Sequence, residues 1–140
     1  MSDPKVDLRG FLDGVRTIAV VGLSPKQQRD SHRVAAYLQN SDYRILPVYP
    51  CGGCEILGEK AYDSLADLVA AGERPDLVDV FRRPDAVPEI VDTVIAGGIP
   101  RLWLQLGVAN AQAEARAVEA GVAVVSDRCL MVEHRRLLGG

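Results

Sequence analysis

Short apolar runs alternate along this chain with stretches whose apolar residues recur at helical spacing. The runs are rich in β-branched side chains and are bounded by turn residues, which is typical of buried strands. We therefore predict strands at residues 17–21, 44–49, 77–81, 102–106 and 122–125.

Helices are predicted between these strands. After a cap at Asp30 or Ser31, Val34, Ala35 and Leu38 recur at helical spacing. A second cap is expected at Asp63 or Ser64. The predicted helices cover residues 6–14, a segment from about residue 31, and 64–72, 84–96, 109–120 and 129–138.

Strands that alternate with helices predict a parallel sheet with helices on both faces. The expected fold is therefore a Rossmann-like three-layer α/β/α domain with a five-stranded parallel sheet. Right-handed crossovers favour the order 3-2-1-4-5, with the strands counted along the chain. We expect one domain over residues 1–140, since no repeat or linker interrupts the pattern.

Ligands of such sheets bind beyond the carboxyl ends of the strands, near the point where the strand order reverses. The first of these ends has the sequence IAVVGLSPKQQRDSHR, in which Gly22 allows a tight turn before a helix. Amides at the helix start, with Ser24, Lys26 and Arg29, would suit a phosphate. The alternative is that Gly22 only turns the chain and the cations are solvated.

A dinucleotide site would have a second glycine where Ser24 stands, and an acidic residue after the second strand. That strand ends instead in Val48, Tyr49 and Pro50. The absence of both features makes NAD the less favoured ligand.

Two further strand ends carry candidate binding residues. In FRRP, Phe81 is positioned to line an adenine and Arg82 or Arg83 to reach a phosphate. The alternative is a core Phe81 with surface arginines, which we favour for Arg83. In LQLGV, the amide of Gln105 either caps a neighbouring loop or faces the cleft, because a buried amide needs partners.

The cysteines do not form a recognisable metal or catalytic motif. Cys51 and Cys54 flank two glycines, which discourage the helix that usually follows a redox dithiol, and no ligands with paired spacing complete a zinc site. We predict a flexible loop with incidental thiols. Cys129 and His134 are five residues apart and would point in different directions on one helix, so Cys129 is predicted to be structural.

Composition adds limits on the class of protein. The 140 residues are 48% hydrophobic and 25% charged, with a net charge of -3, which is ordinary for a globular domain and does not indicate a nucleic-acid partner. The apolar runs are far shorter than a membrane span, and residues 1–10 do not resemble a secretory signal. An odd number of cysteines fits a reducing compartment, so a cytoplasmic protein is expected.

Several blocks in order resemble the CoA-binding-domain family, which comprises small stand-alone bacterial proteins related to the amino-terminal domain of the succinyl-CoA synthetase α-subunit. The resemblance covers about residues 17–137, through IAVVGLSPKQQRDSHRVAAYL, YRILPVYP, LGEKAYDSLADL, VDVFRRPDAVPEIV, LWLQLGV and VVSDRCLMVEHRRL. Relatives often have asparagine where this chain has Tyr49.

The resemblance implies a Rossmann-like domain that binds CoA, with the ADP part near the first turn and the ends of the second and third strands. By position, it implies a phosphate-side loop, a wall, an adenine-side contact and a cleft border. The phosphate-side loop is Gly22, Leu23, Ser24, Pro25 and Lys26, and the wall is Tyr49 and Pro50. The adenine-side contact is Phe81 and Arg82, and the cleft border is Leu104, Gln105 and Gly107. Arg29 joins the phosphate contacts. The synthetase's phosphorylated histidine lies on a domain that is not part of this chain, so neither His32 nor His134 inherits its role.

We therefore expect a cytoplasmic protein that binds CoA or acyl-CoA, with no catalytic residues, metal, nucleic acid or membrane contact. The alternative is an NAD(P)-binding oxidoreductase or nucleotide sensor on the same fold. A third hypothesis is a redox or metal protein that uses Cys51, Cys54 and Cys129.

Overall fold

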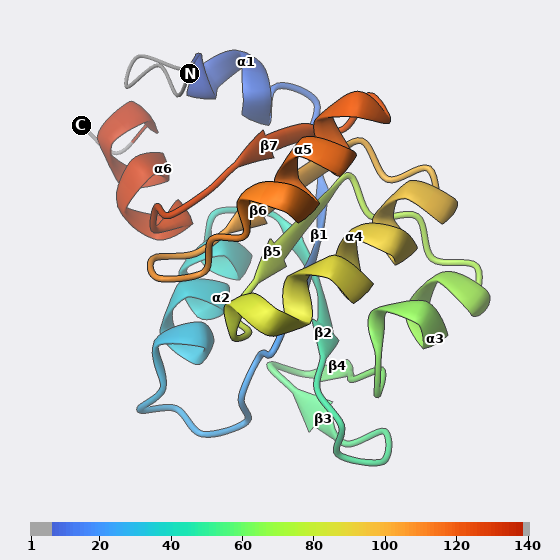
Figure 1. Ribbon diagram of the computed structural model, residues 1–140. Coiled ribbons are helices and arrows are strands. Elements are labelled where there is room, and N and C mark those ends of the chain that lie inside the picture. The colour runs from blue at the N-terminus through green and yellow to red at the C-terminus, as the bar shows by residue number, and fades with distance from the viewer. Residues whose placement is uncertain (1–6, 139–140) are drawn as a thin grey trace.

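Five parallel strands form the centre of the computed structural model, which describes residues 7–138 (Figure 1). They are β1 (Thr17–Val21), β2 (Arg44–Val48), β5 (Leu77–Val80), β6 (Arg101–Leu104) and β7 (Ala123–Val125). Each agrees with a predicted strand to within two residues. All neighbouring pairs are parallel, so the predicted Rossmann-like α/β fold is confirmed.

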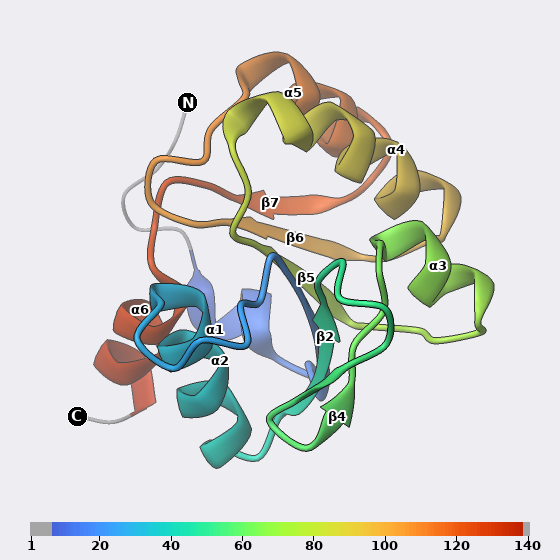
Figure 2. The same ribbon diagram turned by 90° about the horizontal axis from the view of Figure 1, so that it is seen from below.

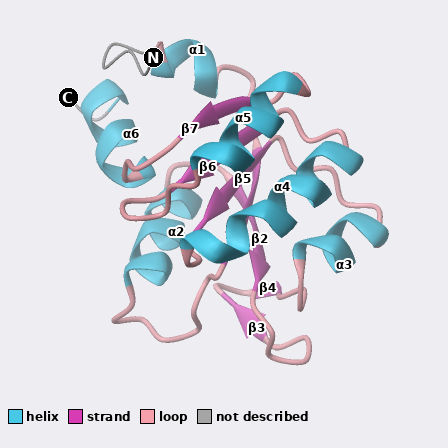
Figure 3. Cartoon of the chain, viewed as in Figure 1, coloured by secondary structure: helices cyan, strands magenta, loops and turns pink. Residues whose placement is uncertain are grey.

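Helices connect the strands, as the spacing of apolar residues predicted (Figure 3). The first helix was predicted at 6–14 and is shorter, and residue 6 lies outside the described residues. The 3₁₀ turn η1 (Pro84–Ala86) leads directly into α4. The α-helices are α1 (Leu8–Leu12), α2 (Asp30–Asn40), α3 (Leu65–Ala70), α4 (Val87–Ala96), α5 (Ala111–Glu119) and α6 (Leu130–Leu138).

The helices form two layers with the sheet between them (Figure 2). Helices α3, α4 and α5 cover one face, and α1, α2 and α6 cover the other. Successive residues of β1 therefore belong to different cores. Ala19 and Val21 pack beneath α4, whereas Ile18 and Val20 pack with α2 and α6. Burial on both faces explains why the strands are continuously apolar.

The predicted strand order is wrong in one respect. The sheet has the order β2-β1-β5-β6-β7, which is 2-1-3-4-5 when the five strands are counted along the chain. Strand β2 is thus an edge strand, and its Pro47 explains why. The Pro47 carbonyl points away from β1 and accepts a hydrogen bond from Tyr62 N (2.9 Å), so a further strand on that side would need an amide hydrogen that proline does not have.

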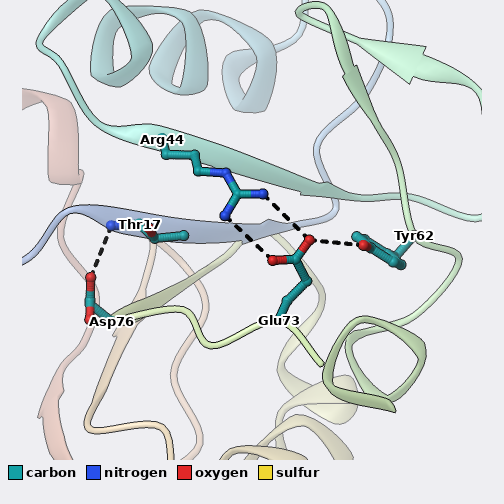
Figure 4. Close-up of polar contacts among 5 residues, drawn as sticks. All are labelled: Thr17, Arg44, Tyr62, Glu73 and Asp76. Carbon is teal, nitrogen blue, oxygen red and sulfur yellow. Dashed lines mark hydrogen bonds and ion pairs between the residues drawn. The ribbon is translucent and has the colours of Figure 1, made fainter. Parts of the chain in front are cut away.

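A short hairpin and a polar cluster cover this edge. The hairpin, β3 (Glu55–Ile56) and β4 (Glu59–Lys60), leads to Tyr62, which bridges to Val48. Figure 4 shows the cluster, in which Tyr62 Oη donates to Glu73 Oε2 (3.0 Å) and the Arg44 guanidinium forks onto the same carboxylate. Arg44 is the first residue of β2, and Glu73 lies in the segment after α3. These contacts therefore hold that segment against the edge strand β2.

Cys51 and Cys54 are joined by a disulfide, with their Cα atoms 5.6 Å apart. The prediction of a flexible loop with incidental thiols is therefore wrong. The glycines that discourage a helix here have positive φ angles, 70° at Gly52 and 85° at Gly53. Such angles turn the chain tightly enough to bring the two cysteines together.

No helix among residues 7–138 is long and apolar enough to span a bilayer.

Candidate functional site

The turn after β1 brings the ends of β1 and β5 very close together. Gly22 has a φ of 86°, and a Cβ at this position would lie 2.3 Å from the carbonyl oxygen of Phe81. Glycine is therefore required by backbone packing as well as by conformation. A substitution at Gly22 would disturb the fold before it tested any ligand contact.

Backbone amides of this turn are occupied by the protein itself. Gly22 N and Leu23 N both donate to Val48 O (2.9 and 3.3 Å), and Ser24 N donates to Ser31 Oγ (3.0 Å). Lys26 N donates to Ser24 Oγ (3.1 Å). These four amides are therefore not available to an anion, because they already donate to other groups of the protein.

The start of α2, unlike the turn, has backbone amides that an anion could contact. Its N-cap is Arg29, and no side chain caps the helix, so the predicted cap at Asp30 or Ser31 is not formed. The first amides of a helix carry the positive end of its dipole. Here His32 N donates to Arg29 O (3.1 Å), whereas Asp30 N and Ser31 N have no hydrogen-bond partner among the described residues. An anion is therefore attracted to this helix end, beside the guanidinium of Arg29.

A cavity of about 870 Å³ lies against this helix end, and we call it the cationic cavity. Its charged side chains are four basic groups and one acid, and the Asp30 carboxylate pairs with Arg33. Charge and helix dipole thus both favour a polyanion. The lining residues are Gly22, Ser24, Lys26, Gln28, Arg29, Asp30, Ser31, Tyr49, Phe81, Arg82 and Arg83.

A second cavity, of about 380 Å³, adjoins the first and is called the β2 cavity. Gly22, Tyr49 and Arg82 line both, so the two are direct neighbours. Its walls are mainly aliphatic and aromatic, with acids at the side. The remaining lining residues are Val21, Val48, Pro50, Asp63, Ser64, Leu65, Ala66, Glu89, Ile90 and Thr93.

A third cavity, of about 270 Å³, lies on the other side and is called the Gln105 cavity. Asp30 and Phe81 line both it and the cationic cavity. The three cavities therefore lie in a row along the carboxyl ends of β2, β1, β5 and β6, and together we call them the groove. Besides these two residues, the Gln105 cavity is lined by Arg33, Val34, Gln105, Leu106, Cys129, Met131 and Val132.

Behind Gln105 lies a buried acid that the sequence analysis missed. Asp79, in the middle of β5, is fully buried and accepts a hydrogen bond from Gln105 Nε2 at 2.7 Å. Its Oδ2 has no hydrogen-bond partner among the described residues. Burial raises the pKa of Asp79 to about 7, and the bond from Gln105 opposes this rise. The signal was an acid within the apolar run LVDVF.

Most of the predicted site residues are brought together by the fold. Gly22, Ser24, Lys26, Arg29, Tyr49, Pro50, Phe81, Arg82 and Gln105 line the groove. The side chains of Leu23 and Leu104 are instead fully buried in the cores. Pro25 is exposed, and Gly107 N donates to Asp127 Oδ1 (2.8 Å). These four residues are not among those that line the groove.

Comparison with known proteins identifies the family. The family model described as a CoA binding domain matches residues 16–135, which is most of the chain. The chain belongs to this CoA-binding-domain family. The resemblance recognised in the sequence is thereby confirmed.

Full-length relatives of this CoA-binding domain are known. The uncharacterized protein YneT of Bacillus subtilis is 36% identical over 136 residues, covering 96% of this chain and 97% of YneT. The structure of cell-free ID.343 from Thermus thermophilus shares 43% identity and a TM-score of 0.87, covering 99% of this chain and 100% of that one. A hypothetical protein from Pyrococcus horikoshii OT3 shares 39% identity and a TM-score of 0.87, covering 95% and 91%.

Among residues 7–138, no group of three or more His, Cys, Asp or Glu side chains is arranged to hold a metal ion.

Proposed function

We propose that this protein binds CoA in the groove, as a binding protein rather than an enzyme. The observation that carries the proposal is the sequence of three connected cavities, with the cationic one in the middle. CoA has the same arrangement of parts. Its 5′-diphosphate lies between an adenosine, whose ribose also carries a 3′-phosphate, and a long, largely uncharged pantetheine arm.

The phosphates of CoA suit the cationic cavity. Lys26, Arg29 and Arg82 offer charged donors, and Arg29 stands at the uncapped start of α2. Charge-assisted hydrogen bonds to phosphate are stronger than neutral ones, and arginine makes them with two parallel donors.

The adenosine suits the β2 cavity. Tyr49 lines both cavities and offers an aromatic face to the base, and Pro50 adds an aliphatic wall. Asp63 and Ser64 bring polar groups to the same cavity. Asp63 Oδ1 accepts from Gly52 N and Ser64 Oγ accepts from Asp67 N, each at 3.0 Å. Asp63 Oδ2 and the Ser64 hydroxyl hydrogen are then left for the ribose 2′-hydroxyl, since the 3′-oxygen of CoA carries a phosphate.

Binding without catalysis is supported by what surrounds the titratable groups. Asp79 is fully buried behind Gln105. His134 is 6% exposed, and its Nδ1 is engaged with Tyr37 Oη at 2.8 Å. Neither side chain lines the groove. We therefore assign neither residue as an acid or base toward a bound thioester.

Isothermal titration calorimetry with CoA, acetyl-CoA and NAD(P) tests this proposal. We expect saturable heat with CoA, and weaker or no heat with NAD(P). An absence of heat with CoA at near-millimolar concentration would overturn the proposal.

An NAD(P)-binding protein is the competing function, and one observation favours it. Asp63 and Glu89 line the β2 cavity, so an acid for ribose hydroxyls is present although none follows β2 directly. The same calorimetric series decides between the two ligands. Tight binding of NAD(P) with negligible binding of CoA would support the competitor.

The arginine variants test where the phosphates lie. Arg29→Ala and Arg82→Ala each remove a charged donor from the cationic cavity, so we expect CoA affinity to fall roughly 10-fold in each, on the scale of a lost charge-assisted hydrogen bond. Arg74→Ala is the matched control, since Arg74 is exposed and lies outside the groove. Equal affinities for all three variants would show that the phosphates lie elsewhere.

A further inference from the structure

The Gln105 cavity has a lining that phosphates would not use. Val34, Leu106, Met131 and Val132 give it aliphatic walls, and Leu106 remains 66% exposed. Ligand cavities are typically lined by apolar side chains with a few polar groups. The cavity therefore favours a partly aliphatic ligand segment.

The cavity is also placed to receive a segment attached to a phosphate. It meets the cationic cavity at Asp30 and Phe81, on the side away from the β2 cavity. A ligand with its phosphates at the start of α2 and its base beside Tyr49 therefore extends its remaining arm toward Gln105.

The inner wall carries an unused hydrogen-bond acceptor. Gln105 is 5% exposed, and its Nε2 is committed to Asp79 Oδ1. No hydrogen bond to its Oε1 is found within residues 7–138, and Asp79 Oδ2 is the buried side-chain oxygen there that lacks a partner, so Gln105 Oε1 is an accessible acceptor in the cavity wall. The amide N–H groups of a pantetheine arm are donors of the required kind.

A thiol lines the same cavity. Cys129 is the free cysteine of the described residues, since Cys51 and Cys54 are bonded to each other. It is partly exposed and precedes α6, which packs beside α2. From the sequence, Cys129 was predicted to be structural. Its place in the wall of the groove, together with the open acceptor of Gln105, indicates a role toward ligand.

We propose that the Gln105 cavity receives the pantetheine arm of CoA, and that Cys129 forms a mixed disulfide with the CoA sulfur when CoA is supplied as its disulfide. This inference rests on the proposed function. The Cys129 sulfur, as thiolate, attacks one sulfur of CoA disulfide. A Cys129–CoA S–S bond forms, the original S–S bond breaks, and the departing CoA thiolate takes up the proton released by Cys129.

Two consequences distinguish this site from a randomly accessible cysteine. Reaction at Cys129 is guided by the nucleotide, so it depends on the cationic cavity. The product is a chain whose groove is covalently filled by CoA, and a reducing thiol reverses it.

The test uses full-length protein carrying Cys51→Ser and Cys54→Ser, in which Cys129 is the single thiol, because the chain has three cysteines. Intact-mass spectrometry follows the adduct with CoA disulfide, and with cystamine as a disulfide without the nucleotide. We expect CoA disulfide to react at least about 10-fold faster, because binding holds the two sulfurs together.

Three arms identify the cause of the acceleration. Adenosine 3′,5′-bisphosphate is the nucleotide part of CoA. We expect it to slow the reaction of Cys129 with CoA disulfide but not the reaction with cystamine. Arg29→Ala should likewise slow the reaction with CoA disulfide and leave the reaction with cystamine unchanged. Arg74→Ala should change neither of these two rates. Cys129→Ser should form no adduct. In the chain with all its cysteines, peptide mapping should find CoA on Cys129.

The outcomes separate this inference from the proposed function. If calorimetry detects CoA binding but CoA disulfide reacts no faster than cystamine, the inference is overturned and CoA binding stands. CoA attached to Cys51 or Cys54 in the complete chain would also overturn it, since the thiol would then lie at the other end of the groove. If CoA does not bind at all, both fail.

Discussion

Asp79 is the residue whose environment departs furthest from that of the same group in water. Burial in β5 raises the pKa of Asp79 to about 7 from its usual value of 3.8. Between about pH 4 and pH 7 the folded chain keeps a proton that the unfolded chain has lost. Stability from this group is therefore greatest at acidic pH, falls as pH rises through that window, and is level above it.

Asp79→Asn tests this assignment. Asparagine keeps an acceptor for Gln105 Nε2 but cannot ionise. We measure the free energy of unfolding in urea for the variant and the wild type. We expect the value for the variant minus that for the wild type to increase as pH rises from 4 to 7, by up to roughly 4 kcal/mol. Unfolding curves that differ by the same amount at pH 5 and pH 8 would show that Asp79 ionises normally.

Gly22 provides a second test at the scale of one residue. Gly22→Ala combines a strained φ with a clash against the Phe81 carbonyl, so we expect a loss of more than about 1–3 kcal/mol in stability. Gly72→Ala is the control, because its φ is also positive but a Cβ there meets no atom within 4 Å. Thermal unfolding compares the two variants. Equal losses would mean that close packing at Gly22 contributes nothing.

Sequence alone could place the basic residues of the groove but not its free amides. Lys26, Arg29 and Arg82 follow strand ends, and the strands were recognisable from their apolar runs. Which amides remain free depends on Val48 and Ser31, which reach the turn from β2 and α2. Those partners are fixed by tertiary packing, which the local pattern does not contain.

At the scale of elements, α2 and α6 are fastened by a polar contact inside an apolar layer. Tyr37 Oη lies 2.8 Å from His134 Nδ1, and the rings of Tyr37 and Tyr43 both pack edge-on against the imidazole. Burial lowers the pKa of His134, which favours the neutral ring. The same two helices border the Gln105 cavity, so this contact supports one wall of the groove.

Tyr37→Phe is expected to lower stability by about 1 kcal/mol, the usual net value of one hydrogen bond. Tyr43→Phe is the matched control, because Tyr43 packs on the same ring without a hydrogen bond to it. Urea unfolding at pH 7.5 measures both. A larger loss in Tyr43→Phe than in Tyr37→Phe would contradict the assigned contact.

The order of the strands was predictable from one residue that the analysis did not use. Pro47 belongs to an edge strand, because it lacks a donor for a second neighbour. The five strands of the parallel sheet followed from the apolar runs, whereas the short hairpin of β3 and β4 was not predicted. The disulfide between Cys51 and Cys54 was harder to foresee, since it depends on two glycines that each adopt a positive φ.

In the whole molecule, the sheet places every part of the groove at the carboxyl ends of its strands. Turns after β1, β2, β5 and β6 each contribute a wall, and the polar cluster around Glu73 fastens the outside of β2 (Figures 1 and 4). Ligand that binds this folded edge and not the unfolded chain raises stability by mass action.

We propose that one CoA molecule lies along the groove with its 5′-diphosphate at the start of α2. A crystal structure of the complex with CoA tests it most directly. The account predicts phosphate density beside Arg29 and Arg82, adenine beside Tyr49, and the pantetheine arm directed toward Gln105. A vacant groove, or phosphates bound away from α2, would contradict it.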